Sequence, residues 1–411
     1  MAEPKAFRCV TCGREFPPWS VDYFCPRCGF PAGNLEVLYD RDKPLRHFPD
    51  PTRFSLWRYG ELLPVGEEHA VRLRAGGTPL YPWAQAAEEL GLGALWIKDD
   101  TLQPTASCKD RGTAVTVAVA KRLGRKALAC ASTGNAASSL AGFCAAGGIP
   151  CYIFVPKNAP APKIAQLVAF GAFVFRVDGN YDQAFALALA ASQEFGWYNR
   201  SDGLNPMVVE GNKTVAFEIW EELGDVPEAV VVAVGDGAVI AGVCKGFLEL
   251  KEAGLAPRVP KVFGVQAAGA AAVAHAFARF QRGEPILPAE EPAETLADSI
   301  RVGKPADVVK AVKYVAETGG GYVTASDPEL LSAARELARR AGVFAEPSGA
   351  APYAALLRLV REGALGQKDR VVLIITGSGL KDPQGVTRDL PEPPLIRPDL
   401  RAVREAVERC A

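Results

Sequence analysis

The sequence lacks several features that would place it in a common class of binding protein. It has almost no excess of charge, because 46 basic side chains accompany 47 acidic ones over 411 residues. Neither a phosphate polymer nor an anionic lipid surface would attract such a chain strongly, so we expect no nucleic-acid or membrane partner. It also lacks an apolar run near the roughly 18 residues that a bilayer-spanning helix needs. Residues 1–5 are polar and do not resemble a signal peptide, so we expect a cytoplasmic protein.

Cysteine is present, and its spacing separates two groups. Six cysteines are scattered, mostly among small apolar residues, which indicates core positions rather than a disulfide framework. They are Cys108, Cys130, Cys144, Cys151, Cys244 and Cys410. The other four, Cys9, Cys12, Cys25 and Cys28, form two CxxC pairs, each followed by a glycine that suits a tight turn.

We interpret the two CxxC pairs as one structural Zn²⁺ site. Each pair brings two thiolates to an ion from one turn, and the second pair completes a tetrahedron. Four thiolates leave no open position for chemistry, so the site would stabilise a small module rather than catalyse a reaction. A redox CxxC, two unrelated pairs, or iron in place of zinc are the alternatives.

The remainder of the chain alternates strand and helix patterns. Short apolar runs predict strands over 94–98, 126–131, 150–155, 172–177, 229–234, 262–265 and 371–375. Helical patterns lie between them, over 113–123, 136–146, 161–170, 181–195, 213–223 and 238–252. Near-continuous apolar strands separated by helices predict an α/β fold with parallel sheets covered on both faces. Segments 34–75, 284–293 and 390–398 are expected to have little regular structure.

Four loops that follow predicted strands carry unusual residues, over 104–112, 131–138, 234–242 and 376–382. Ligands of open parallel sheets bind at the carboxyl ends of strands, so these loops are the candidate site. The first holds Lys109 at the start of a helix, which is either a solvated lysine or an amine kept partly neutral for Schiff-base chemistry. The second, around Ser132 and Asn135, fits an anion such as a carboxylate, although N-capping explains single residues equally well.

The third loop runs Gly235-Asp236-Gly237 and suits a phosphate. A dinucleotide site would require an acidic residue at the end of the next strand, where Gln266 stands, so a single phosphate ester is the better ligand. The three histidines lie outside all four loops. One lysine, a monophosphate loop and polar groups for a ring and a carboxylate predict a pyridoxal 5′-phosphate site.

These loops resemble those of the threonine synthases, in the tryptophan-synthase-β-like family of pyridoxal phosphate enzymes. The resemblance spans about residues 55–385 and rests on five runs: 76–80, Ser107-x-Lys109-Asp110-Arg111-Gly112, 132–135, 210–218 and 376–382. It implies two parallel-sheet α/β domains, a large one over 41–115 and 221–385 and a small mobile one over 116–220. A zinc-ribbon-like module over 1–40 and a tail with a short helix over 386–411 would complete the chain.

The resemblance also implies roles for individual residues. Lys109 would form the Schiff base and move protons, while the reaction converts O-phospho-L-homoserine and water to L-threonine and phosphate. The cofactor ligands would be Lys109, Asn135 at the ring hydroxyl, Gly235, Asp236, Gly237, Ala238 and Val239 at the phosphate, and Thr376 at the pyridine nitrogen. The substrate would contact Ser107, Ser132, Thr133 and Lys213. Relatives of this kind are commonly dimeric, so we expect a homodimer.

Three positions depart from the family pattern: Cys108 replaces an aromatic residue, Asn212 replaces glutamine, and Val208 replaces an arginine associated with the substrate phosphate. Valine cannot offer the two-pronged guanidinium contact. A second hypothesis therefore keeps the cofactor and changes the amino acid, as in a β- or γ-replacement or elimination enzyme resembling cysteate synthase. A third is a non-catalytic cofactor-binding regulatory protein, which the presence of Lys109 disfavours.

Overall fold

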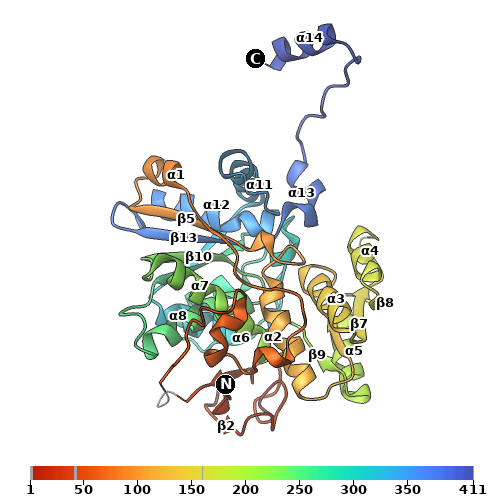
Figure 1. Ribbon diagram of the computed structural model, residues 1–411, viewed down its shortest axis with the longest axis vertical. Coiled ribbons are helices and arrows are strands. Elements are labelled where there is room, and N and C mark those ends of the chain that lie inside the picture. The colour runs from red at the N-terminus through yellow and green to blue at the C-terminus, as the bar shows by residue number, and fades with distance from the viewer. Residues whose placement is uncertain (1–2, 41–43, 160, 411) are drawn as a thin grey trace.

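The computed structural model describes residues 3–40, 44–159 and 161–410, and is an α/β protein built around two sheets (Figure 1). Residues 1–2, 41–43, 160 and 411 lie outside the described part of the chain, as do the side chains of 161, 162, 409 and Cys410. The predicted fold class is confirmed. Within the described residues, no helix combines the length and apolar character needed to cross a membrane.

The larger sheet has six strands, and all neighbours except the last pair are parallel. Its order is β12 (Gly321–Ala325), β11 (Lys261–Ala267), β10 (Ala229–Ala233), β13 (Arg370–Ile375), β5 (Ala94–Asp99) and β4 (Leu80–Pro82). Every residue of the central strand β10 is buried. Val230 and Val232 face one hydrophobic core and Val231 faces the other, which explains why this strand is an uninterrupted apolar run.

The smaller sheet has four parallel strands. Its order is β8 (Phe173–Val177), β7 (Cys151–Pro156), β6 (Leu128–Ala131) and β9 (Tyr198–Asn199). Helices α3 (Asn135–Gly147), α4 (Ala161–Ala169) and α5 (Tyr181–Phe195) connect these strands. In Figure 1 this unit lies at one side of the larger sheet, so a boundary between the two sheets runs through the molecule.

Helices cover both faces of the larger sheet. On one face lie α1 (Ala84–Glu89), α11 (Asp327–Glu336) and α12 (Pro347–Arg361), whose apolar residues share a core. The other face carries α2 (Lys109–Arg122), α6 (Pro206–Asn212), α7 (Thr214–Leu223), α8 (Ala238–Glu252), α9 (Ala272–Gln281) and α10 (Val308–Glu317). Two short helices, α13 (Pro383–Thr387) and α14 (Leu400–Cys410), end the chain, and α14 stands away from the body (Figure 1).

The N-terminal segment forms a small antiparallel sheet of β1 (Ala6–Cys9), β2 (Glu15–Phe16) and β3 (Leu35–Leu38). The expectation of little regular structure over 34–75 is corrected here, because this segment contains β3 and a 3₁₀ helix over Leu56–Leu62. Segments 284–293 and 390–398 are irregular, as predicted.

Candidate active site

Two of the four loops are fastened to each other at the carboxyl ends of β5 and β13. The N–H of Cys108 donates to the Thr376 carbonyl at 2.8 Å, and the N–H of Ser378 donates to the Ala106 carbonyl at 3.0 Å. Ala106 has a φ of 64°, a left-handed conformation that few residues other than glycine adopt. The paired loops therefore form a fixed edge from which α2 begins.

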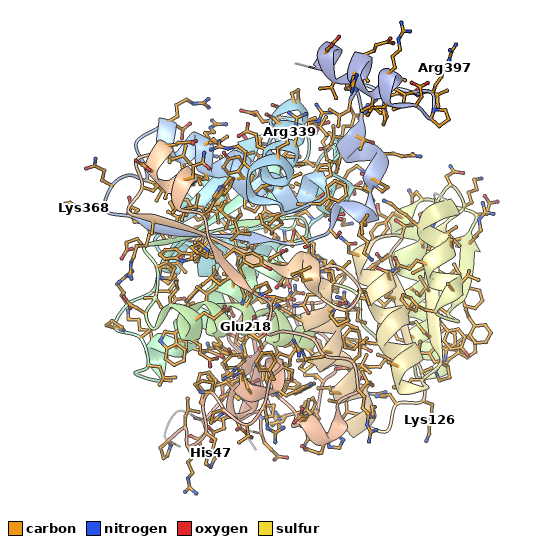
Figure 2. The ribbon with its side chains drawn as sticks, turned by 45° about the horizontal axis from the view of Figure 1, so that its top comes forward. His47, Lys126, Glu218, Arg339, Lys368 and Arg397 are labelled. Atoms are coloured by element: carbon orange, nitrogen blue, oxygen red, sulfur yellow. The ribbon has the colours of Figure 1, made fainter. Side chains whose placement is uncertain are left out.

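Buried charges fix the first turn of α2. Arg111 is 1% exposed and lies 2.7 Å from Asp100 Oδ1 and 2.6 Å from Glu218 Oε1. Asp110 accepts a hydrogen bond from the Thr105 N–H at 2.6 Å. In Figure 2, Glu218 lies near the middle of the view, whereas His47, Lys126 and Lys368 lie at the edge of the body. Because their partners occupy different elements, these side chains hold the neighbouring lysine at a defined place in the interior.

Lys109 lies opposite a carboxylate, with its Nζ 2.5 Å from Asp202 Oδ2. Burial lowers the pKa of Lys109, but the carboxylates of Asp202 and Asp236 outweigh burial, so this pKa is raised overall. Arg200 binds the other oxygen of Asp202. Burial raises the pKa of Asp202, but Arg200 and Lys109 together hold it down at about 2. In this structure Lys109 is thus held in an ion pair with Asp202, and its raised pKa favours the charged form of the amine.

One cavity of about 990 Å³ connects the loops of both sheets. It is lined by most of the residues expected to bind cofactor or substrate: Lys109, Ser132, Thr133, Asn135, Gly235, Asp236, Gly237, Val239 and Thr376. These come from the ends of β5, β6, β10 and β13, so residues more than 250 positions apart in sequence meet in one space. A cavity of this size holds a cofactor and a small substrate together.

The glycine loop after β10 requires its glycines. A Cβ on Gly235 would lie 3.1 Å from the Ser299 carbonyl oxygen. Gly237 has a φ of 106°, and a Cβ there would lie 2.9 Å from Ala311 Cβ. Since α8 starts at the next residue, the loop leads into a helix N-terminus beside the cavity, a position that favours binding of phosphate esters.

Asp236 is the unusual residue of this loop. Its Oδ1 accepts a hydrogen bond from the Ala238 N–H at 3.0 Å. Burial, and then repulsion from Asp202, raise the pKa of Asp236 to about 7. The carboxyl is therefore neutral in a large fraction of molecules near pH 7, so it can lie beside an anionic ligand at low electrostatic cost.

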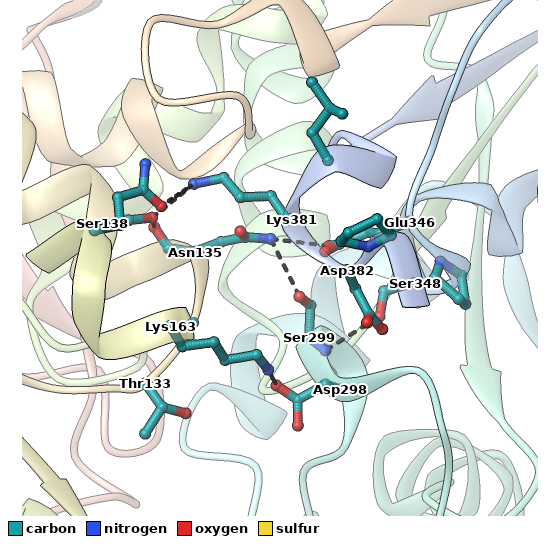
Figure 3. Close-up of a pocket in the computed structure, with 15 residues that line it drawn as sticks. Thr133, Asn135, Ser138, Lys163, Asp298, Ser299, Glu346, Ser348, Lys381 and Asp382 are labelled. Atoms are coloured by element: carbon teal, nitrogen blue, oxygen red, sulfur yellow. Dashed lines mark hydrogen bonds and ion pairs between the residues drawn. The ribbon is translucent and has the colours of Figure 1, made fainter. Parts of the chain in front are cut away.

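Asn135 begins α3 and reaches across to the larger sheet (Figure 3). Its Nδ2 donates to Glu346 Oε1 at 2.9 Å and to Ser299 Oγ at 3.1 Å. Burial raises the pKa of Glu346, although Ser299 and Asn135 lower it in part. Figure 3 also shows Lys163 of α4 paired with Asp298, a second link between the two sheets beside a smaller cavity of about 210 Å³.

Three predicted residues do not line the cavity. Ala238 is buried behind the glycine loop, and Ser107 is buried with no hydrogen-bond partner for its hydroxyl among the described residues. Lys213 is fully buried elsewhere, 2.6 Å from Glu210 Oε2 and 2.8 Å from Glu249 Oε2. An amine enclosed by two carboxylates has no free direction for a substrate, so we assign Lys213 to this internal ion cluster instead.

Sequence reasoning missed Asp202, Ser299 and Glu346. Asp202 follows β9, which has only two residues and gives no recognisable apolar run. Glu346 and Ser299 lie in segments whose secondary structure was not predicted. Searching for polar residues after every possible strand, however short, would have found Asp202.

The four N-terminal cysteines converge as predicted from their spacing. Their sulfur atoms all lie within 4.8 Å of one another. Cys9 and Cys25 are buried and Cys12 is exposed. Hydrogen bonds to the sulfur, above all from the Arg14 N–H, lower the pKa of Cys12 to about 7, which favours the thiolate that binds metal. This donor set suits a tetrahedral metal ion.

Comparison with known proteins gives consistent results. The family model "Pyridoxal-phosphate dependent enzyme" matches residues 71–377. The threonine synthase of Methanosarcina acetivorans is 38% identical over 410 residues, which cover 97% of this chain and 98% of that protein. The threonine synthase of Methanocaldococcus jannaschii is also 38% identical, over 98% of this chain and 99% of its own length.

Solved structures share the fold. A threonine deaminase from Solanum lycopersicum superimposes with a TM-score of 0.62 at 22% identity, covering 80% of this chain and 87% of its own. Serine racemase from Dictyostelium discoideum has a TM-score of 0.61 at 23% identity, covering 73% of this chain and 92% of its own.

Proposed function

This chain belongs to the family of pyridoxal-phosphate-dependent enzymes, and we propose that within the family it is a threonine synthase, a lyase that converts O-phospho-L-homoserine and water to L-threonine and phosphate. The observation that carries the proposal is the cavity that joins Lys109, Asn135, the glycine loop and Thr376. Near-full-length identity to threonine synthases supports the same reaction.

The residues of the cavity fit pyridoxal phosphate. The glycine loop has little space for a side chain at Gly235 or Gly237, leads into α8, and carries at Asp236 a carboxyl that can be neutral. Lys109 would bond to the aldehyde carbon, and Asn135 would hydrogen-bond the ring hydroxyl. Residues 235–239 would bind the phosphate, and Thr376 would face the pyridine nitrogen. When bound, the cofactor supplies an aldehyde that condenses with amines and a ring that withdraws electrons from the substrate α-carbon.

Lys109 is the residue that would move protons. Its Nζ has to be neutral before it can remove a proton from the α- or β-carbon and charged after it has done so. Asp202, 2.5 Å away, stabilises the charged form. Arg200 in turn holds Asp202 ionised, so we propose that Asp202 positions Lys109 and sets the pKa of its amine. Ser132 and Thr133, at the start of α3, would bind the substrate carboxylate through hydroxyl and N–H groups.

The substrate phosphate requires cations that position 208 does not supply. Val208 is fully buried against α2, where a Cβ on Gly112 would lie 2.9 Å from its Cγ1. Arg301 and Lys304 line the cavity instead, and Lys304 has no charged partner among the described residues. We propose that these two side chains take over the recognition of the phosphate.

The decisive test is phosphate release. Purified chain loaded with cofactor is mixed with O-phospho-L-homoserine, and phosphate and L-threonine are measured. We expect both in equal amounts from the wild type and neither from Lys109→Ala. Lys121→Ala, on the same helix but exposed and outside the cavity, is the matched control and should retain activity.

A second candidate keeps the cofactor and changes the amino acid. Val208 favours it, because valine stands where the family resemblance expects the arginine associated with the phosphate of O-phospho-L-homoserine. A cysteate-synthase-like reaction of phosphoserine with sulfite is one form of it. An absence of phosphate release, combined with a spectral response of the bound cofactor to another amino acid, would favour this candidate.

Four further properties belong to the proposal. We propose a structural Zn²⁺ on Cys9, Cys12, Cys25 and Cys28, supported by the convergence of their sulfur atoms. We propose a homodimer, supported by the resemblance to dimeric relatives, which sedimentation would test. A cytoplasmic location is supported by a cysteine content without a disulfide pattern. The division into a large domain and a mobile small domain over 116–220 also remains a proposal.

A further inference from the structure

The N-terminal module of residues 3–40 forms part of the wall of the active-site cavity. Phe30 and Pro31 line the same cavity as Lys109 and Asp236. Both belong to the loop that directly follows Cys28, the last of the four clustered cysteines. A segment expected only to stabilise an appendage therefore contributes side chains to the site.

The loop that carries Phe30 is closed by its own backbone. The Gly29 N–H donates to the Cys25 carbonyl at 2.9 Å, the Gly33 N–H donates to the Gly29 carbonyl at 2.6 Å, and the Cys25 N–H donates to the Gly33 carbonyl at 2.8 Å. A Cβ on Gly33 would lie 2.7 Å from the Gly29 carbonyl oxygen, so the loop is tightly folded. The backbone that carries Phe30 is therefore tied to Cys25, one of the four clustered cysteines.

Phe30 contacts the unit that holds the smaller sheet. Its ring stacks on Phe185 of α5, with centroids 5.6 Å apart and an interplanar angle of 15°. Tyr181 lies one turn earlier on α5, and its ring centroid is 6.4 Å from that of Phe185. All three rings line the cavity, so they form an aromatic wall with one ring from the cysteine module and two from α5.

The same module is anchored to the glycine loop from behind. Asn34 Nδ2 donates to Asp307 Oδ1 at 2.8 Å and to the Ala306 carbonyl at 2.7 Å. The Asp307 N–H in turn donates to the Asp236 carbonyl at 3.0 Å. The module is thus linked to the glycine loop through Asp307 and contacts α5 directly, and these two attachments restrict where Phe30 lies relative to both.

We propose that Phe30 is a specificity-determining residue of the active site, held in place by the four-cysteine loop, and that its ring limits the size of the amino-acid side chain the cavity accepts. The inference rests on the proposed function only in requiring that the cavity bind an amino acid at the cofactor. Loading of the four cysteines with metal would set the position of the ring, because the loop is closed directly onto Cys25.

Binding of amino acids to the cofactor-loaded protein tests the proposal, with the absorption spectrum of the cofactor as the readout. Phe30→Ala should bind L-phenylalanine at least fivefold more tightly than the wild type does, while its Kd for L-serine changes less than twofold. The Kd of Phe30→Leu for L-phenylalanine should lie between those of the wild type and Phe30→Ala. Phe16→Ala is the matched control, because Phe16 belongs to the same module and does not line the cavity.

A purely structural role for Phe30 would change the Kd of both amino acids by the same factor, and that result would overturn the proposal. If Phe30→Ala does not fold, Phe30→Leu and Phe185→Leu provide the same comparison, one from the module and one from α5. Removing metal from the cofactor-loaded wild type with a chelator should reproduce the Phe30→Ala selectivity. Unchanged selectivity after metal loss would overturn the positioning by the cysteine loop.

The outcome is separable from that of the proposed function. A wild type that releases no phosphate from O-phospho-L-homoserine would contradict the threonine synthase assignment, yet the size selectivity could still be measured with L-serine and L-phenylalanine. Conversely, an active wild type whose selectivity is the same in Phe30→Ala would remove Phe30 from the site and leave the assignment intact.

Discussion

Arg111 and Glu218 form a two-pronged ion pair inside the molecule, with Nη1 and Nη2 donating to the two carboxylate oxygens at 2.6 and 2.8 Å. The Gly77 N–H also donates to Glu218, at 2.8 Å. Three of the sequence runs that marked the family resemblance therefore meet at one buried carboxylate. Their shared role is structural, since the pair fixes the start of the helix that carries Lys109.

Replacing Glu218 with glutamine should destabilise the protein strongly. Arg111 would remain buried with less compensating charge, a defect that costs about 3–5 kcal/mol when one partner of a buried pair is removed. Urea unfolding of cofactor-free protein measures the change. Glu405→Gln, at an exposed ion pair on α14, should stay within about 0.5 kcal/mol of the wild type. Equal stability of the two variants would contradict this account.

Asp202→Asn should shift the pH dependence of cofactor capture. Asp202 is one of the carboxylates that raise the pKa of Lys109, so its loss lowers that pKa and supplies neutral amine at lower pH. The rate of the absorbance change on mixing pyridoxal phosphate with cofactor-free protein should then rise at a lower pH than in the wild type. Turnover should fall about tenfold or more, since a positioned acid–base partner is lost.

The matched control for this variant is Asp178→Asn, which removes an exposed carboxylate paired with Lys157. Its pH profile should coincide with that of the wild type. A profile of Asp202→Asn that also coincides would show that Asp202 does not set the pKa of Lys109.

Cofactor affinity should weaken as the pH rises through about 7. The raised pKa of Asp236 means that its carboxyl is protonated below about pH 7 and ionised above it, and only the ionised form repels the phosphate. The Kd for pyridoxal phosphate should therefore increase more between pH 6 and pH 8 in the wild type than in Asp236→Asn. Because the phosphate itself titrates in both proteins, the difference between them isolates Asp236, and parallel curves would refute the prediction.

Cys12→Ser should lose the bound metal. The variant removes one of four converging sulfur atoms, and a tetrahedral thiolate site with three ligands binds its ion more weakly. Metal per chain, measured by plasma mass spectrometry, should fall from about one to near zero. Cys151→Ala serves as the control, because Cys151 is buried in β7 outside the cluster, and it should keep its metal.

Lys304→Ala should raise the KM for O-phospho-L-homoserine about tenfold, equivalent to about 1.4 kcal/mol of lost binding. The lost interaction would be a charge-assisted contact with the substrate phosphate. Lys304→Arg should keep most of the affinity, since the cation remains. An unchanged KM in Lys304→Ala would assign phosphate recognition to another group, and steady-state kinetics with a phosphate-release assay decides between these outcomes.

Much of the fold could be predicted because the buried strands carry a strong local signal. The run at 229–234 corresponds to β10 of the structure, and the helix predicted over 181–195 matches α5. Segment 268–361 gave no such signal. Its strand β12 is only partly buried and starts at a glycine, so it does not form the apolar run that marked the other strands.

The candidate site could be predicted where residues follow long strands, and less well where only tertiary contacts define them. Lys109 and the glycine loop line the cavity that the sequence placed at strand ends. The raised pKa of Lys109 could not be foreseen, because it depends on Asp202, 93 positions along the chain. The burial of Lys213 could not be foreseen either, because the packing of α6 on α8 places its carboxylate partners.

The attachment of the N-terminal segment has a practical consequence for anyone who wishes to shorten the chain. Its first forty residues are no detachable tag, because Asn34 hydrogen-bonds Asp307, and the Tyr39 hydroxyl donates to Glu210 at 2.5 Å. Truncation would expose these carboxylates to solvent and open the active-site cavity along one side. A shortened protein that still folded would thus have an active site open to bulk solvent on the side that Phe30 and Pro31 cover in the full-length chain.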